Sequence, residues 1–308
     1  MRRRSHWNPM IRGHARNRTK LSTRFTRLFG YLSLAERDEQ LSYVIGPRHN
    51  PVEWQDFELK WGSPFGHQDL KRRVLFGLAR RFARLSWQAK AVGPFGFQSD
   101  NNATRAFEYP WAFHVLPVGP SHTVVDLGGS LGGLQFVLSK QGARVVNVDP
   151  GDNDRGRWRV DGETIATFNR AFRTSVELRK TSLAQAGFAS ASVDRLYCIS
   201  TLEHVPEAEI ASLAREIGRI LTPGGYAVLT IDLFYDLAPF TSRSSNVHGR
   251  NIDVRAFVED SGLKLHIGER SELCGYPEFD PDAIQSRAME FVQGDIALNT
   301  TQALVLRQ

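Results

Sequence analysis

A glycine-rich turn carries the clearest chemical signal in this 308-residue chain. Residues 124–133 read Val-Val-Asp-Leu-Gly-Gly-Ser-Leu-Gly-Gly, and there an apolar strand pattern gives way to a helical pattern. Glycines let the backbone turn tightly and approach a ligand, and the free N–H groups at the start of a helix favour a carboxylate or a phosphate. The turn therefore predicts a site for an anionic small-molecule group, although a tight loop without a ligand has the same pattern.

Asp149 is the second chemical signal. It ends the next apolar run, residues 145–148, about twenty residues after the glycines. An acid in this place can accept hydrogen bonds from both hydroxyls of a ribose. Dinucleotide-binding enzymes share the arrangement, so these two features alone leave the kind of cofactor open.

The elements that must position these residues begin at residue 121, where strand and helix patterns alternate. The alternation predicts a doubly wound, mostly parallel, seven-stranded sheet of the Rossmann-like kind with helices on both faces. Two adjacent late strands predict an antiparallel edge. The expected strands are 123–127, 144–148, 175–179, 193–199, 226–231, 263–267 and 303–306. The expected helices are 134–140, 164–172, 209–221 and 252–260.

Residues 103–265 resemble the class I S-adenosylmethionine-dependent methyltransferases. The resemblance covers about half of the chain and rests on four segments in a fixed order. These are Asp126-Leu127-Gly128-Gly129-Ser130-Leu131-Gly132, Asp149, the strand 193–199 with the following Leu202-Glu203-His204-Val205-Pro206, and Leu221-Thr222-Pro223-Gly224-Gly225.

The resemblance implies that S-adenosylmethionine is the cofactor and S-adenosylhomocysteine the product. It implies that Asp149 binds the ribose and that the backbone near Ser200 faces the methionine amino group. The residues implied at the methionine end are Asp126, Gly128, Gly129, Ser130 and Gly132. Ser130 replaces the second glycine of the commonest pattern, and Ser182 replaces the usual adenine-binding acid. These departures put the openness of the turn and the adenine contact in question.

An Arg/Glu/aromatic cluster precedes the first strand at residues 105–111. Such a cluster often covers the cofactor in enzymes of this kind, so Arg105 is a further candidate cofactor-binding residue. A packed helix start with Pro110 in its first turn is the alternative. The cluster also resembles methyltransferases that act in glycan and natural-product biosynthesis.

Three side chains are candidates for a general base. His204 and Asp232 follow predicted strands at the sheet edge where ligands bind, and His248 lies in a polar segment that resembles a loop over the acceptor site. Methyl transfer is an in-line displacement that gains much from alignment, and a base helps only where the acceptor must lose a proton. A structural role for His204 and a solvent-exposed place for His248 remain the alternatives.

The charge of the chain is uneven. Residues 1–92 hold 19 lysines and arginines against 7 acids, whereas the rest holds 20 against 26. We interpret residues 1–30 as a basic arm and 31–102 as a lid region with a helix at 69–90, before a cofactor-binding domain at 103–308. A mitochondrial transit peptide, a surface that steers RNA or another anionic substrate, and peripheral membrane contact are alternatives for the basic region.

The composition sets further expectations. No apolar run is long enough to span a bilayer, and Cys198 and Cys274 form neither a disulfide framework nor a metal-ligand pattern, so we expect a cytoplasmic protein without a metal. The favoured function is transfer of a methyl group to an O or N atom of a small molecule, such as a natural product or glycan precursor. An RNA methyltransferase and a non-catalytic binding protein with the same fold are the other hypotheses.

Overall fold

The computed structural model describes residues 44–45, 85–97, 105–151, 159–289 and 299–308. The chain divides after Glu39 into two units, and every described residue belongs to the second, Gln40–Gln308. The predicted basic arm and most of the predicted lid region lie outside these residues. Of the helix predicted at 69–90, only the end is described, as α5 (Leu85–Val92), which is followed by the short 3-10 helix η3 (Pro94–Phe97).

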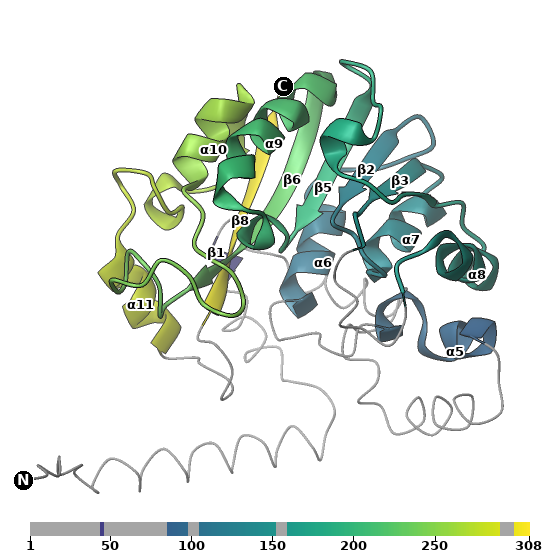
Figure 1. The fold of residues 1–308 in the computed structure, drawn as a ribbon, viewed down its shortest axis with the longest axis horizontal. Helices are drawn as coiled ribbons and strands as arrows, with labels where there is room; N and C mark the ends of the chain where they lie inside the picture. Colours follow the sequence, from purple (N-terminus) through teal and green to yellow (C-terminus); the bar gives the residue numbers. More distant parts are fainter. Residues whose placement is uncertain (1–43, 46–84, 98–104, 152–158, 290–298) are drawn as a thin grey trace, which may run out of the picture. The chain divides into compact units, whose positions relative to one another are not determined.

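The described strands form one mixed sheet (Figure 1). Its order is β1-β8-β6-β5-β2-β3-β4, and β7 pairs with β8. The strands are β1 (Val44–Ile45), β2 (Thr123–Leu127), β3 (Arg144–Val148), β4 (Glu177–Arg179), β5 (Val193–Ile199), β6 (Leu221–Phe234), β7 (Lys264–Ile267) and β8 (Asn299–Arg307). The seven predicted strands are therefore confirmed, and the two residues of β1 add an eighth.

Strand direction follows the prediction. The pairs from β4 through β3, β2 and β5 to β6 are parallel, whereas β8 runs antiparallel to β6 and β7. The reversed strand, drawn yellow in Figure 1, is thus flanked by neighbours on both sides.

Helices cover both faces of the sheet (Figure 1). The α-helices other than α5 are α6 (Arg105–His114), α7 (Gly133–Lys140), α8 (Gly162–Phe172), α9 (Glu207–Ile220), α10 (Val254–Ser261) and α11 (Pro281–Met289). Short 3-10 helices lie at η4 (Leu183–Gln185), η5 (Leu202–His204) and η6 (Arg270–Glu272). The four predicted helices are confirmed with ends that move by one or two residues.

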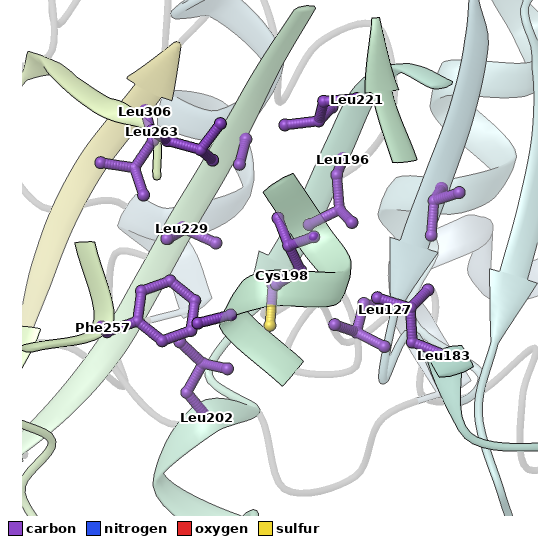
Figure 2. Packing of buried hydrophobic residues seen from close by; sticks show 14 of the residues in the cluster. Leu127, Leu183, Leu196, Cys198, Leu202, Leu221, Leu229, Phe257, Leu263 and Leu306 are labelled. Carbon is purple, nitrogen blue, oxygen red and sulfur yellow. The ribbon is translucent and has the colours of Figure 1, made fainter. Parts of the chain in front are cut away.

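The core has two layers because successive strand residues face opposite sides. Val124 and Tyr197 pack with apolar residues of α6, α7 and α8 on one face. Their neighbours Val125 and Cys198 pack with residues of α9 and α10 on the other, and Figure 2 shows part of this second cluster around Leu196, Leu229 and Phe257. Buried apolar area of this kind supplies about 25 cal/mol per Å² and is the main term that holds the sheet between its helices.

The connections after β2 and β5 diverge. After β2 the chain enters α7 on one face, and after the adjacent β5 it enters α9 on the other. The carboxyl ends of these two strands therefore border the point where the winding reverses, and a crevice forms there in open α/β sheets.

Candidate functional site

A cleft of about 650 Å³ lies at this point of the sheet. A cleft of this size accommodates a drug-sized ligand. All nine residues predicted to bind the cofactor line it, together with His204: Arg105, Asp126, Gly128, Gly129, Ser130, Gly132, Asp149, Ser182 and Ser200. The structure thus brings into one cleft residues that are far apart in the sequence.

The glycine-rich turn has no room for a side chain at two of its positions. Gly128 has φ +69°, and a Cβ there would lie 2.4 Å from Cγ2 of Thr201. A Cβ at Gly129 would lie 2.5 Å from Oδ2 of Asp126. Ser130 also has a left-handed φ, 45°, which is the conformation that the commoner glycine adopts without strain. The serine therefore occupies a glycine-like backbone position, and the loop keeps its shape at a conformational cost.

Two buried amides hold the turn in this shape. Gln135 Nε2 donates to the carbonyl oxygens of Gly129, Ser130 and Gly132 at 3.2, 3.1 and 2.9 Å. Asn147 Nδ2 donates to Ser130 O at 2.8 Å and to Gln135 Oε1 at 2.9 Å. Since neither side chain is exposed, these hydrogen bonds do not compete with water and can offset the strain at Ser130.

Asp149 is tied to the turn by its backbone partners. Its Oδ2 accepts from Ser130 N at 2.9 Å, and its Oδ1 accepts from Gly151 N at 2.7 Å. Each carboxylate oxygen has a second lone pair, so both can still accept a hydroxyl of a ligand. The N-terminus of α7 faces the same cleft through Gly132, and its N–H groups have no side-chain cap.

Asp126 lies beneath the turn and is 3% exposed. Burial, and then the neighbouring Asp149, raise the pKa of Asp126 to about 7. An unfolded chain ionises this residue near pH 4, so the folded chain holds an extra proton between about pH 4 and 7. Stability from this residue is therefore present at low pH and falls as the pH rises through that window.

We expect Asp126→Asn to remove this pH dependence. The difference in thermal midpoint between the variant and the wild type should move in favour of the variant between pH 4.5 and 7.5, measured without cofactor. Asp232, the other acid with a pKa raised to about 7, is present in both proteins and cancels in the comparison. A difference that stays constant with pH would contradict the assignment.

Glu108 connects α6 to the centre of the sheet. Its fully buried carboxylate accepts from Ser200 Oγ at 2.5 Å and from Thr230 Oγ1 at 2.7 Å, and it pairs with Arg105 one turn earlier. Arg105 lines the cleft with a side chain that is 19% exposed. One interpretation of the sequence was a packed helix start with Pro110 in its first turn. Pro110 instead lies inside α6, and the same helix carries Arg105, which lines the cleft.

The three candidate bases occupy different places. His204 lines the cleft, and its side chain is 49% exposed. Asp232 lies behind Ser200, whose Oγ is 3.3 Å from its Oδ1, and burial and then Glu108 raise its pKa to about 7. His248 is exposed and stacks on Phe234 at a ring distance of 6.5 Å, outside the residues that line the cleft.

Four polar residues that the sequence analysis left without a role lie at this site: Glu108, Gln135, Asn147 and Glu203. Asn147 and Gln135 do interrupt apolar patterns, in a buried strand and a buried helix. This interruption was a usable signal, because polar residues in such places are usually hydrogen-bonded. Glu108 lies in the cluster at residues 105–111, and Glu203 lies in the segment that follows the strand 193–199. The spacing of residues along the sequence does not show which side chains these two acids contact.

The described residues were also searched for a metal site, a disulfide and a membrane-spanning helix. Within them, no three His, Cys, Asp or Glu side chains are placed to hold a metal ion. Both cysteines are buried free thiols. No helix in the described part of the chain is long and apolar enough to cross a membrane.

The family profile described as "Methyltransferase domain" matches residues 125–229, the segment that forms the glycine turn, the cleft and the strand after α9. This match covers about a third of the chain, and the strand order and motifs above agree with it: this segment is a methyltransferase domain of the class I, S-adenosylmethionine-dependent kind. The cofactor of that family is S-adenosylmethionine.

Individual relatives match more loosely. The ubiquinone biosynthesis O-methyltransferase of Hahella chejuensis is 31% identical over 117 residues, which are 38% of this chain and 43% of that protein. The match therefore spans under half of the relative's length. A solved S-adenosylmethionine-dependent methyltransferase from Mesorhizobium loti has a TM-score of 0.44 and 19% identity over 65% of this chain and 97% of its own.

A geranyl diphosphate C-methyltransferase from Streptomyces coelicolor A3(2), solved with Mg²⁺, geranyl diphosphate and S-adenosylhomocysteine, has a TM-score of 0.42 and 17% identity. The aligned part is 66% of this chain and 79% of that one.

The residues of the cleft fit the family's cofactor. The N–H groups at the start of α7 have no side-chain cap, and Asp149 keeps free lone pairs. Arg105 is the one permanently positive side chain among the described residues that line the cleft. A carboxylate, a ribose and an amino group can each find a partner of suitable chemistry there.

Proposed function

We propose that this chain is an enzyme that transfers the methyl group of S-adenosylmethionine to an O or N atom of a small molecule, such as a natural product or glycan precursor. The observation that carries the proposal is the cleft in which Asp149 is bonded to the backbone of the glycine turn. The O-methyltransferase relative adds support for transfer to oxygen.

The cofactor, when bound, supplies a methyl group on a positively charged sulfur. In the proposed arrangement Asp149 binds the ribose hydroxyls, Ser182 lies on the adenine side, and Arg105 binds the carboxylate. Ser200 and Asp126 lie on the methionine side. Alignment of the acceptor with the methyl group then supplies much of the rate.

His204 is the better placed of the candidate bases. It combines a place in the cleft with a half-exposed ring, whereas Asp232 is closed off behind Ser200 and His248 lies on an exposed loop. A base at this position matters only for an acceptor that must lose a proton during transfer. We propose that His204 takes that proton from a hydroxyl acceptor.

The direct test is incubation with methyl-labelled S-adenosylmethionine and fractionated pools of small molecules and RNA. We expect the label in a small-molecule fraction. Label in RNA would replace the small-molecule proposal with the RNA hypothesis. Cofactor binding without any labelled product from either pool would favour a binding protein with the methyltransferase fold.

A further inference from the structure

A row of three cations and one tyrosine crosses four strands of the sheet. Arg195 on β5 pairs with Tyr226 on β6, and Tyr226 pairs with Arg307 on β8. Arg307 pairs in turn with Lys264 on β7. Residues directly opposite one another on paired strands point to the same face of a sheet. These four residues, the cation row, therefore lie side by side on the face where Tyr226 packs against the core cluster of α6, α7 and α8; Figure 1 shows β5, β6 and β8 as neighbours.

Tyr226 stands between the two guanidinium groups of the cation row. Cζ of Arg195 lies 4.9 Å from the centre of the tyrosine ring, and Cζ of Arg307 lies 5.7 Å from it. Since β5 and β8 lie on opposite sides of β6, the two arginines approach the ring from opposite sides. The imidazole of His266 lies 5.2 Å from the same ring. A tyrosine ring attracts cations, and this contact uses none of the five N–H donors of an arginine.

The three cations have no acidic partner in the described part of the chain. No ion pair there includes Arg195, Arg307 or Lys264. The four strands of the row carry two acids, Asp194 and Asp232. The carboxylate of Asp194 accepts a hydrogen bond from a backbone N–H of β2 at 2.8 Å, and Asp232 lies about 20 Å further along β6 than the row. The positive charge of the row is therefore not neutralised within the described sheet.

This arrangement is unfavourable by itself. Arg307 and Lys264 are directly opposite each other in an antiparallel pair, where like charges destabilise a sheet. Charges on an edge strand prevent pairing with another sheet, and this accounts for Lys264 on β7, whose neighbour among the described strands is β8. It does not account for Arg195 and Arg307, because β5 and β8 have neighbours on both sides. An anionic partner would relieve the repulsion within the row.

The cation row is open to a partner. Lys264, Arg307 and His266 are exposed, and Arg195 and Tyr226 are half-buried. None of these residues lines the cofactor cleft. A partner on the row would therefore leave the cofactor and the acceptor free to bind.

The chemistry of the row favours carboxylates over other anions. Single-stranded nucleic acids bind through bases that stack on open aromatic rings, but guanidinium groups flank Tyr226 on both sides. A membrane surface is bound through apolar side chains that enter the lipid, and the exposed large hydrophobic residue of the described chain, Val247, lies on the loop after β6. A carboxylate matches the fork of an arginine with two parallel hydrogen bonds. Acidic side chains of a protein satisfy the row best.

We propose that the cation row is a docking surface for an acidic, extended segment of a partner protein. The row from Arg195 to Lys264 crosses three strand spacings, which is about 14 Å. In an extended segment alternate side chains share a face, and acids at the first, third and fifth of five positions span about 13 Å. Three acids on one face thus match the three cations in number and in reach. Because the row lies outside the cleft, the proposal does not depend on the function proposed above.

The test is fluorine NMR of the full chain labelled with 3-fluorotyrosine. The Tyr226 signal is assigned by its loss in Tyr226→Phe, and it reports on the row separately from the basic residues 1–92. The probe is a short peptide with glutamate at alternate positions and serine between, and the comparison peptide has glutamine in place of glutamate. We expect the glutamate peptide to shift the Tyr226 signal saturably and the glutamine peptide to leave it in place. No shift with glutamate, or an equal shift with glutamine, would overturn the proposal.

Arg307→Gln and Lys264→Gln each remove one exposed charge from the row. At low salt each should weaken the affinity for the glutamate peptide about threefold, and the double variant about tenfold, because exposed ion pairs are individually weak. The thermal midpoint should hold or rise, since the repulsion between the two residues is lost. Unchanged peptide affinity in the double variant would contradict the proposal. If the double variant does not fold, Lys264→Gln alone decides, and an unchanged affinity there overturns the proposal.

Arg215→Gln is the matched control. Arg215 is 61% exposed and lies on α9, which packs on the opposite face of the sheet. Its loss removes the same charge and should leave the peptide affinity within about twofold. A loss equal to that of Arg307→Gln would mean that net charge alone attracts the peptide, against the proposal. A uridine oligonucleotide of equal charge is the last probe, and tighter binding of it at the Tyr226 signal would assign the row to nucleic acid and overturn the proposal.

Discussion

Glu108→Ala is expected to lower the free energy of unfolding by about 3 kcal/mol. The substitution leaves the guanidinium of Arg105 beside an empty space and removes the acceptor of both the Ser200 and Thr230 hydroxyls. Loss of one member of a buried ion pair costs far more than loss of a surface pair, because the remaining charge stays poorly solvated. Chemical denaturation of the two proteins without cofactor measures the difference.

The matched control is Glu259→Ala on α10. Glu259 also pairs with an arginine on its own helix, Arg255, at 2.8 Å, but its side chain is 63% exposed. Surface pairs of this kind contribute about 0–1 kcal/mol. If Glu108→Ala costs no more than Glu259→Ala, Glu108 does not anchor α6 to the sheet.

Asp149→Ala is expected to weaken S-adenosylmethionine binding by about ten- to a hundredfold. Hydrogen bonds to an ionised carboxylate are stronger than neutral ones, and two of them account for a loss of this size. The variant also removes the bonds from Ser130 N and Gly151 N, so the turn loses an anchor as well as a ligand contact. Isothermal calorimetry gives the affinity, and a thermal scan verifies the fold.

Asp253→Ala controls for the loss of an aspartate that accepts a backbone N–H. Asp253 caps α10 by accepting from Ala256 N at 2.8 Å, far along the chain from the glycine turn. Its loss should cost about 1 kcal/mol of stability and leave cofactor affinity unchanged. An equal loss of affinity in the two variants would mean that Asp149 acts through stability and not through contact with the ribose.

The order and type of most elements from residue 121 onward were predictable because their patterns are local. Strand residues alternate between two buried faces, and helix residues repeat with the helical period, so these elements are visible in their own sequence. The sequence analysis missed the helix α11 (Pro281–Met289). The glycine turn and the acid at Asp149 were also predictable, because their spacing is set by one strand-turn-helix unit and the next strand.

Element ends that depend on pairing were not predictable. The strand expected at 226–231 is observed as β6 (Leu221–Phe234), which includes the Pro-Gly-Gly segment. Leu221 pairs with Val193 and Tyr226 with Arg195, so the four residues 222–225 of β6 bulge opposite the single residue Asp194 of β5. Local propensity gives a turn at such a segment, whereas the neighbouring strand decides that it continues.

The polar contacts between distant elements could not be predicted either, because they too depend on how separate parts of the chain pack together. Glu108 meets Ser200 and Thr230, which are 92 and 122 residues further along the chain. Ser130 was recognised as a departure from the usual glycine, but its left-handed backbone and its bonds from Asn147 depend on the folded turn. Spacing within a single sequence carries no information about such partners.

The most direct test of the central claim is a calorimetric titration of the wild-type chain with S-adenosylmethionine, S-adenosylhomocysteine and NAD in turn. The family assignment and the geometry around Asp149 predict that the first two bind with one site per chain and compete with each other, and that NAD displaces neither. Tighter binding of NAD than of S-adenosylmethionine, or no binding of S-adenosylmethionine by a folded chain, would contradict the account.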